Sequence, residues 1–203
     1  MTCTVWMTDA MTDTALNRGF VAPDSYYEDL SAANRTVHRQ RTGALVEKSA
    51  FPPSKLVLKR RLGSLKPMPH FINSDVSFIS KELKELLCQF ELGQTVFHPV
   101  ALYGLDGKEV LGPEYFYINV AERKNAFDPT LSNVEKQRFT DGYMVSLLSE
   151  KSDVVVKSTA CEGVDLWMEA NLYGTMFLSD QLMQAIDDSK YLRKVRFRKC
   201  EVI

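Results

Sequence analysis

The sequence predicts an α+β fold, in which a mostly antiparallel sheet packs against a few helices. Short apolar segments alternate with tight-turn signals along the chain, which is typical of antiparallel strands. One strand–helix–strand pattern also occurs twice. We expect about eight strands and three or four helices from these patterns. No linker divides the 203 residues cleanly, so we expect a single domain covering 1–203.

The repeated unit begins with an apolar pair and a serine, Phe78-Ile79-Ser80 in one copy and Phe177-Leu178-Ser179 in the other. Apolar residues follow each serine at positions +3, +6 and +7, which places one apolar stripe on a helix. A serine directly before such a run is typical of an N-cap, because its hydroxyl accepts a bond from an unpaired backbone N–H. A strand around Phe97 or Phe197 is expected to complete each copy.

The first 50 residues are weakly patterned. Val5-Trp6-Met7 is suited to an edge strand, and Asp24 or Ser25 is suited to cap a short helix. We interpret the basic segment 34–42 as a solvated loop rather than an anion site. Residues 43–47 are expected to form a further strand.

The middle of the chain carries the clearest strand signals. Strands are predicted over 55–62 and 95–103, the second at an edge or with a bulge because Pro99 cannot donate to a ladder. Aromatic residues on both faces of 114–121 predict a central strand covered on both sides. Asp106-Gly107 between them indicates a tight turn.

The remaining segments complete the expected set of elements. A helix is predicted over 81–90, and 133–140 is polar and suited to an exposed helix or loop. Further strands are predicted over the alternating or apolar segments 143–148, 154–157, 164–169 and 195–202.

Composition excludes several classes of protein. A hydrophobic content of 45% with 25% charged residues is ordinary for a globular chain, and a net charge of −1 gives no field that would attract nucleic acid or a membrane. No basic residue precedes Arg18 and no apolar run is long enough to cross a bilayer, so neither a secretory signal nor a membrane span is expected. The sequence predicts a cytoplasmic protein.

The four cysteines form no CxxC pair and no regular spacing, so we expect reduced thiols without disulfides. Cys88 lies in a leucine-rich helical segment and is expected to be a small buried hydrophobe.

Motif searches assign no catalytic, metal-binding or cofactor-binding residue. The chain contains no GxxxxGK[ST], GxGxxG, HExxH or GxSxG motif, and its three histidines lie in different segments. Cys161 with a distant histidine satisfies only the loosest form of a thiol-nucleophile pattern. The carboxylate pairs Asp165/Glu169 and Asp187/Asp188 are interpreted as surface charge rather than acid–base machinery.

A basic stretch near the C-terminus is the one local feature that suggests a contact surface. It contains six cations, Lys190, Arg193, Lys194, Arg196, Arg198 and Lys199. On a strand, Arg196 and Arg198 would share a face and could form bidentate pairs with carboxylates or phosphates of a partner. The alternative is that these charges protect an edge strand from aggregation. Aromatic residues for base stacking are nearly absent there, which disfavours nucleic acid.

Residues 70–203 resemble a known bacterial family. The segments that carry the resemblance are 71–83, 96–100, 106–107, 114–128 and 165–182, of which Glu114-Tyr115-Phe116-Tyr117-Ile118-Asn119-Val120 is the most specific. They are similar to immunity protein family 11 of polymorphic toxin systems. The resemblance implies a non-enzymatic cytoplasmic protein that binds and neutralises a cognate toxin, with no catalytic residues to carry over. Residues 1–50 carry no part of it.

Two surfaces are candidates for toxin contact, the Arg196/Arg198 strand and the 104–113 hairpin tip with Asp106, Lys108 and Glu109. Two other functions stay open at this point. The chain could be an accessory or binding module for another protein partner, or an enzyme whose site no motif reveals.

Overall fold

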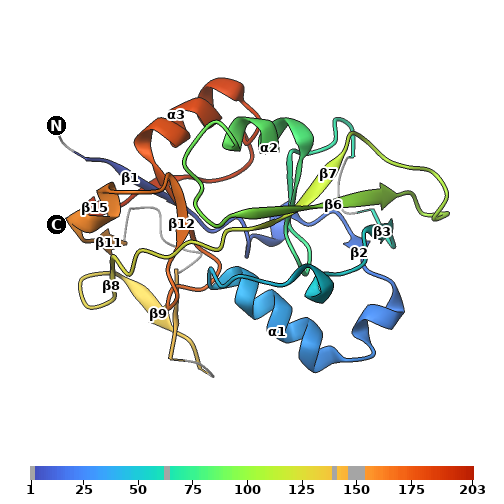
Figure 1. Cartoon of the computed structure of the whole chain (residues 1–203), viewed down its shortest axis with the longest axis horizontal. Helices are drawn as coiled ribbons and strands as arrows, with labels where there is room; N and C mark the ends of the chain where they lie inside the picture. Colours follow the sequence, from blue (N-terminus) through green and yellow to red (C-terminus); the bar gives the residue numbers. More distant parts are fainter. Residues whose placement is uncertain (1–2, 62–64, 139–140, 146–153) are drawn as a thin grey trace.

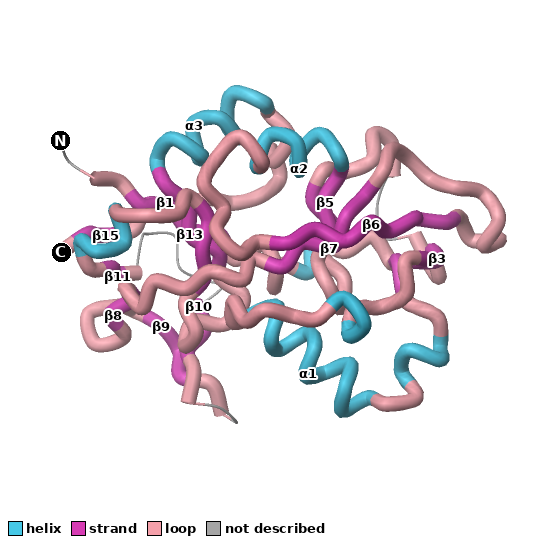
Figure 2. Tube along the Cα trace, viewed as in Figure 1, coloured by secondary structure: helices cyan, strands magenta, loops and turns pink. Residues whose placement is uncertain are grey.

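The computed structural model describes residues 3–61, 65–138, 141–145 and 154–203, and it confirms the α+β class (Figure 1). The described residues contain three α-helices, α1 (Leu30–Arg41), α2 (Lys81–Leu87) and α3 (Asp180–Ser189). In Figure 2, helix α1 lies on one side of strands β6 and β7, and helices α2 and α3 lie on the other. The helices therefore cover a strand layer from both sides.

The largest sheet has six strands in the order β2-β3-β6-β7-β5-β4. All of its pairs are antiparallel except β3 with β6. Its strands are β2 (Phe20–Val21), β3 (Lys55–Leu58), β4 (Phe71–Ile72), β5 (Phe78–Ser80), β6 (Val96–Tyr103) and β7 (Tyr115–Asn119).

Strand β7 is central in this sheet, as its two aromatic faces predicted, because it pairs with both β5 and β6. Strand β6 pairs with β3 only over Ala101–Tyr103. Pro99 lies outside this part of β6 and is opposite Phe116 of β7. Strand β6 lies between β3 and β7, so the expected edge position is wrong for the strand as a whole, although the missing N–H of Pro99 interrupts no pairing with β3.

The second sheet joins the two ends of the chain in the order β12-β13-β1-β14. Its strands are β1 (Val5–Thr8), β12 (Leu166–Met168), β13 (Met176–Ser179) and β14 (Arg198–Lys199). Because β1 pairs with both β13 and β14, the expectation that Val5-Trp6-Met7 forms an edge strand is wrong.

Two small sheets and four 3₁₀ helices complete the described part. The small sheets contain β8 (Phe127–Asp128), β11 (Val155–Val156) and β15 (Glu201–Val202), and β9 (Val134–Lys136) with β10 (Tyr143–Val145). The 3₁₀ helices are η1 (Thr14–Leu16), η2 (Asp24–Tyr27), η3 (Lys48–Ala50) and η4 (Ser158–Cys161). Strand β9 corrects the helix or loop expected over 133–140, of which residues 139–140 lie outside the described part. Residues 146–148 of the strand expected over 143–148 lie outside it as well.

The repeated unit is confirmed in its first two elements. Ser80 caps α2 by accepting a bond from Leu83 N at 3.3 Å, and Ser179 caps α3 by accepting one from Leu182 N, also at 3.3 Å. The two helices contact each other (Figure 1), and their apolar stripes enter one core. The third element differs, because β6 contains Phe97 whereas Phe197 lies before β14 and packs against that core.

The basic segment 34–42 is not a loop, because most of it belongs to α1. The helix begins after Asp29, whose carboxylate accepts a bond from Ala32 N at 2.9 Å. Its fully buried Gln40 donates to Ile118 O of β7 at 2.6 Å, so one polar face of the helix packs against the sheet. Residues 43–47 form no strand, and Val46 N donates to the Asn119 side chain at 2.7 Å instead.

The cysteines also differ from expectation. Cys3 and Cys161 form a disulfide with a Cα–Cα distance of 6.1 Å, which overturns the expected absence of disulfides. Cys88, expected to be buried, is exposed at the end of α2. Among the described residues, no helix is long and apolar enough to cross a bilayer.

Candidate functional site

A groove of about 340 Å³ lies between the proline-rich connector before β4 and the loop that follows α3. This volume is at the lower end of the range, roughly 300–1,000 Å³, in which proteins bind small ligands or side chains. Its lining comes from residues 66–71 on one wall, residues 190–195 on the other, and Leu16 and Arg18 between them.

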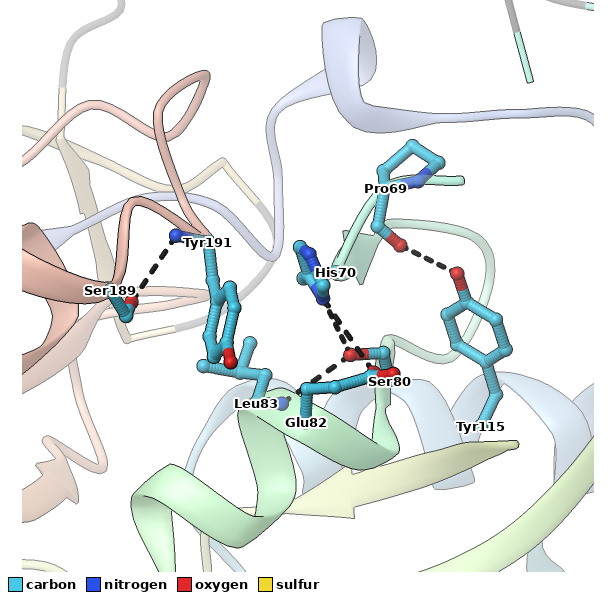
Figure 3. A network of polar contacts seen from close by, with 8 residues as sticks. All are labelled: Pro69, His70, Ser80, Glu82, Leu83, Tyr115, Ser189 and Tyr191. Carbon is cyan, nitrogen blue, oxygen red and sulfur yellow. Dashed lines mark hydrogen bonds and ion pairs between the residues drawn. The ribbon is translucent and has the colours of Figure 1, made fainter. Parts of the chain in front are cut away.

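The wall formed by residues 190–195 is positioned by the end of α3. Lys190 has a positive φ of 59°, a left-handed conformation that reverses the chain direction directly after Ser189. The Ser189 hydroxyl accepts a hydrogen bond from Tyr191 N at 3.2 Å (Figure 3) and donates one to Ile186 O at 2.7 Å, so the turn is bonded on both sides. A left-handed lysine is unfavourable relative to glycine by about 1 kcal/mol.

The opposite wall is fixed by prolines and by the central strand. Pro67 and Pro69 restrict the connector, and the Tyr115 hydroxyl of β7 donates to Pro69 O at 2.7 Å (Figure 3). Burial raises the pKa of Tyr115 well above its usual value, so this hydroxyl stays protonated and keeps its donor role.

His70 and Tyr191 join the two walls. Their rings lie 4.3 Å apart between centroids, and the His70 Nδ1 atom lies 2.7 Å from the Ser80 hydroxyl oxygen that caps α2 (Figure 3). Burial holds the pKa of His70 below its usual value, although the carboxylate of Glu82, 3.8 Å away, partly opposes this. Near neutral pH His70 is therefore chiefly a neutral aromatic contact, and it couples the groove to the start of α2.

The charge lining the groove has one sign. Five of its residues are fixed cations, namely Arg18, Lys66, Lys190, Arg193 and Lys194. Among the described residues of the lining, none is an aspartate or glutamate. A larger hollow of about 580 Å³ beside α1 instead mixes both signs, because Glu28, Asp29 and Glu47 line it together with Arg35 and Arg39.

Arg18 is the buried member of the cationic set, with 7% of its surface exposed. One of its terminal nitrogens donates to Ala15 O and Asn17 O, both at 2.7 Å. Within the described part of the chain, its Nε has no hydrogen-bond partner. A buried guanidinium nitrogen without a partner is costly, and an acceptor from a ligand would satisfy it.

The floor of the groove is apolar, with Leu16, Phe71, Leu192 and Val195 contributed from three different segments. Leu16 and Phe71 belong to the main core, and the other two pack against it. Cations around an apolar floor are suited to bind an anionic chain that also carries an apolar side chain. Among the described residues, no group of three or more histidine, cysteine or carboxylate side chains is placed to hold a metal ion.

The structure separates Arg196 from Arg198, which were expected to share one exposed face. Arg196 is exposed immediately after the groove wall. Arg198 is buried in β14, where its guanidinium pairs with Asp9 at 3.1 Å. Arg198 therefore stabilises the second sheet rather than presenting a charge to solvent.

Asp106, Lys108 and Glu109 lie together in the exposed loop between β6 and β7. The Asp106 carboxylate accepts from the backbone N of Lys108 at 2.9 Å and of Glu109 at 3.2 Å, and these bonds lower its pKa. The base of the loop adjoins the groove, because a Cβ at Gly112 would lie 2.9 Å from Met68 Cγ in the proline wall. The base of the loop therefore contacts the proline wall, whereas Asp106, Lys108 and Glu109 do not line the groove.

A comparison with family models matches residues 11–202 to the Immunity protein family (Imm11). The chain belongs to this immunity protein family. A search of curated proteins finds no match. The family match includes residues 11–50, in which the sequence showed no resemblance, and these residues supply α1 and the groove residue Arg18.

Sequence reasoning identified part of the groove of this Imm11 chain. Lys190, Arg193 and Lys194 belong to the basic stretch that the sequence analysis singled out. The sequence analysis missed Arg18 and Lys66. Both lie far from that basic stretch in sequence, and neither stands in a run of basic residues. The stiff Pro67/Pro69 connector was the available signal that this segment forms a defined wall.

The carboxylates Asp165 and Glu169, interpreted from sequence as surface charge, are both buried. Glu169 accepts a bond from Ala126 N at 3.0 Å, and burial raises its pKa. Nearby, burial lowers the pKa of Lys124 to about 8, and its ammonium lies 3.6 Å from the centroid of the Trp167 ring. Cys161 is bonded to Cys3, so it does not present the free thiol that a nucleophile would need.

Proposed function

We propose that this protein binds a cognate toxin protein and neutralises it without catalysis. The observation that carries the proposal is the match to an immunity protein family over residues 11–202. A neutralising protein acts by forming a tight complex, which requires a stable scaffold and a complementary surface rather than a reactive centre. The partner is a toxin of a bacterial polymorphic toxin system, and protection extends to the producing cell and its siblings.

The groove supports this proposal because its walls are already ordered in the free protein. Tyr115 fixes one wall, the α3 turn fixes the other, and His70 and Tyr191 connect them. A partner that binds such a preformed surface loses less conformational entropy than one that must order it. Cations at the rim also speed association with an oppositely charged partner.

We place the protein in the bacterial cytoplasm, where a neutralising complex would protect the cell's interior. The Cys3–Cys161 disulfide is the observation that favours an oxidising compartment instead. Alkylation of free thiols in intact cells, followed by mass spectrometry of both cysteines, would separate these locations. Reduced cysteines in the cytoplasmic fraction are expected.

The test is co-expression with the product of the neighbouring gene. That product alone is expected to arrest bacterial growth, and the present chain is expected to restore growth and to co-purify with it as a one-to-one complex. A chain with its core disrupted by Leu182→Asp, which should not fold, serves as the negative control, since Leu182 is fully buried. A purified pair that never associates would contradict the proposal.

A further inference from the structure

We propose that the cationic groove between residues 66–71 and 190–195 binds an acidic segment of the toxin that inserts an apolar side chain at its centre. This inference rests on the proposed function and adds to it the binding surface and the chemistry of the partner. It is carried by three independent features of the groove: its charge, its backbone conformation and its floor.

The charge of the groove differs from that of the whole molecule. The chain has 25 basic and 26 acidic residues, with a formal net charge of −1, so its surface as a whole should attract neither sign. The groove nevertheless gathers five cations and, among its described lining residues, no carboxylate. The exposed Lys190, Arg193 and Lys194 repel one another in the free protein, and an acidic partner would relieve this repulsion.

The backbone at Lys190 supports a role in binding. A left-handed turn at the end of a helix is usually made by glycine, yet this position carries a lysine at φ 59°. Lysine there is the less stable choice, and what it adds is an exposed ammonium on the groove wall. Strained residues of this kind are concentrated at functional sites.

The apolar floor favours a peptide over a nucleic acid. Phosphate backbones are bound by cations on an open polar surface, with aromatic rings to stack bases. Here the aromatic rings that line the groove are His70, Phe71 and Tyr191. The Tyr191 ring packs at a tilt against His70, and Phe71 belongs to the main core. Leu192 and Val195, which are only partly buried, instead present aliphatic surface that fits an apolar side chain.

The test compares two variants with the same change of charge. The groove variant carries Lys190→Glu, Arg193→Glu and Lys194→Glu, all at exposed positions. The control variant carries Lys48→Glu, Lys136→Glu and Lys157→Glu, which are exposed outside both candidate contact surfaces. Binding of the purified toxin encoded by the neighbouring gene is measured by interferometry at low and high salt. We expect the groove variant to lose at least about tenfold in affinity and most of its salt dependence, and the control to stay within about twofold.

A second variant separates binding from folding. Lys190→Gly removes one groove cation while supplying the residue that the left-handed turn prefers. Its thermal unfolding temperature is expected to match or exceed that of the unchanged protein, while its toxin affinity falls by about threefold to tenfold, the effect typical of one charge in a partly buried contact.

Zero-length carbodiimide cross-linking identifies the partner segment, because it joins lysine amines only to carboxylates that touch them. Cross-links from Lys190 and Lys194 to aspartate or glutamate residues of the toxin are expected. Cross-links that map instead to Lys48, Lys136 or Lys157 would overturn the inference.

The remaining outcomes are distinguishable. If the unchanged protein rescues growth and binds the toxin but the groove variant does so equally well, the proposed function stands and the groove assignment is wrong. If the unchanged protein does not bind the toxin, the proposed function fails and the inference falls with it. If a labelled DNA or RNA duplex binds and only the groove variant loses it, while toxin binding is unchanged, the groove belongs to nucleic acid and the inference is overturned.

Discussion

The carboxylate of Asp165 connects three segments that are distant in sequence. One oxygen accepts bonds from the Ser179 hydroxyl and the Gln181 side chain, both at 2.6 Å, and the other accepts from Glu91 N at 3.0 Å. Only 4% of the residue is exposed, so water cannot replace these bonds if the carboxylate is removed. Asp165 therefore joins the loop after α2 to the start of α3.

We predict that Asp165→Ala lowers the free energy of unfolding by about 2–3 kcal/mol, because it leaves buried donors without an acceptor. Asp187→Ala is the matched control, since Asp187 is exposed on α3 and its loss should change stability by less than about 0.5 kcal/mol. Urea denaturation followed by circular dichroism measures both. Equal midpoints for the two variants would show that the Asp165 contacts do not stabilise the fold.

The burial of Asp165 was not predictable from its neighbourhood. It stands in an alternating segment in which polar residues ordinarily face water, and its partner Glu91 is 74 residues away. The burial of Arg198 was not predictable either, because its partner Asp9 is 189 residues away. The burial of a charged side chain can be predicted only if the charge or N–H group that pairs with it is known. The local sequence pattern does not contain that information.

At the scale of elements, the two serine caps make the same hydrogen bond to their own helix, but their hydroxyls contact different residues elsewhere in the chain. Ser80 lies 2.7 Å from the His70 ring nitrogen, whereas Ser179 donates to Asp165 at 2.6 Å. The caps were predictable because a cap depends on residues within three positions along the chain. The residues that contact the two serine hydroxyls from outside, His70 and Asp165, could not be predicted, because they belong to other segments of the chain.

We expect Ser80→Ala and Ser179→Ala each to lower the free energy of unfolding by about 1 kcal/mol, the usual effect of losing an N-cap. Ser49→Ala provides the control, because Ser49 is exposed and caps no α-helix. Thermal and urea unfolding of the three variants would measure the effects. If the cap variants were as stable as the Ser49 variant, the capping interpretation of the repeated unit would be refuted.

Helix α1 was missed because its buried face is polar. Its buried residues are Ala33, Thr36 and Gln40, and these occur at helical spacing without the large apolar side chains that normally reveal it. Gln40 replaces apolar contact with hydrogen bonds to the backbone of Ser77, directly before β5, and of Ile118 in β7. A hydrophobic pattern cannot indicate a helix whose buried face is held by hydrogen bonds of a side-chain amide.

At the scale of the whole molecule, the two ends of the chain form one sheet. Strand β1 lies between β13 and β14, and the Trp6 indole donates to Asp180 at 2.8 Å across 174 residues. The α+β class was predictable because it depends on element types and turn lengths. The central place of β1 was not, because pairing across such a distance leaves no trace in the weakly patterned N-terminal segment.

The Cys3–Cys161 disulfide adds a covalent link to this arrangement, closing a loop of 158 residues between the segment before β1 and the end of η4. Closing a long loop restricts the unfolded chain, so oxidation should stabilise the protein by about 2–4 kcal/mol. We predict that urea unfolding under oxidising conditions shows this difference relative to reducing conditions, and that Cys161→Ser abolishes it. Cys88→Ser should retain the full difference, because Cys88 is an exposed free thiol. Equal stability of the oxidised and reduced protein would mean that the hydrogen bonds of β1 alone determine how firmly the N-terminus is held.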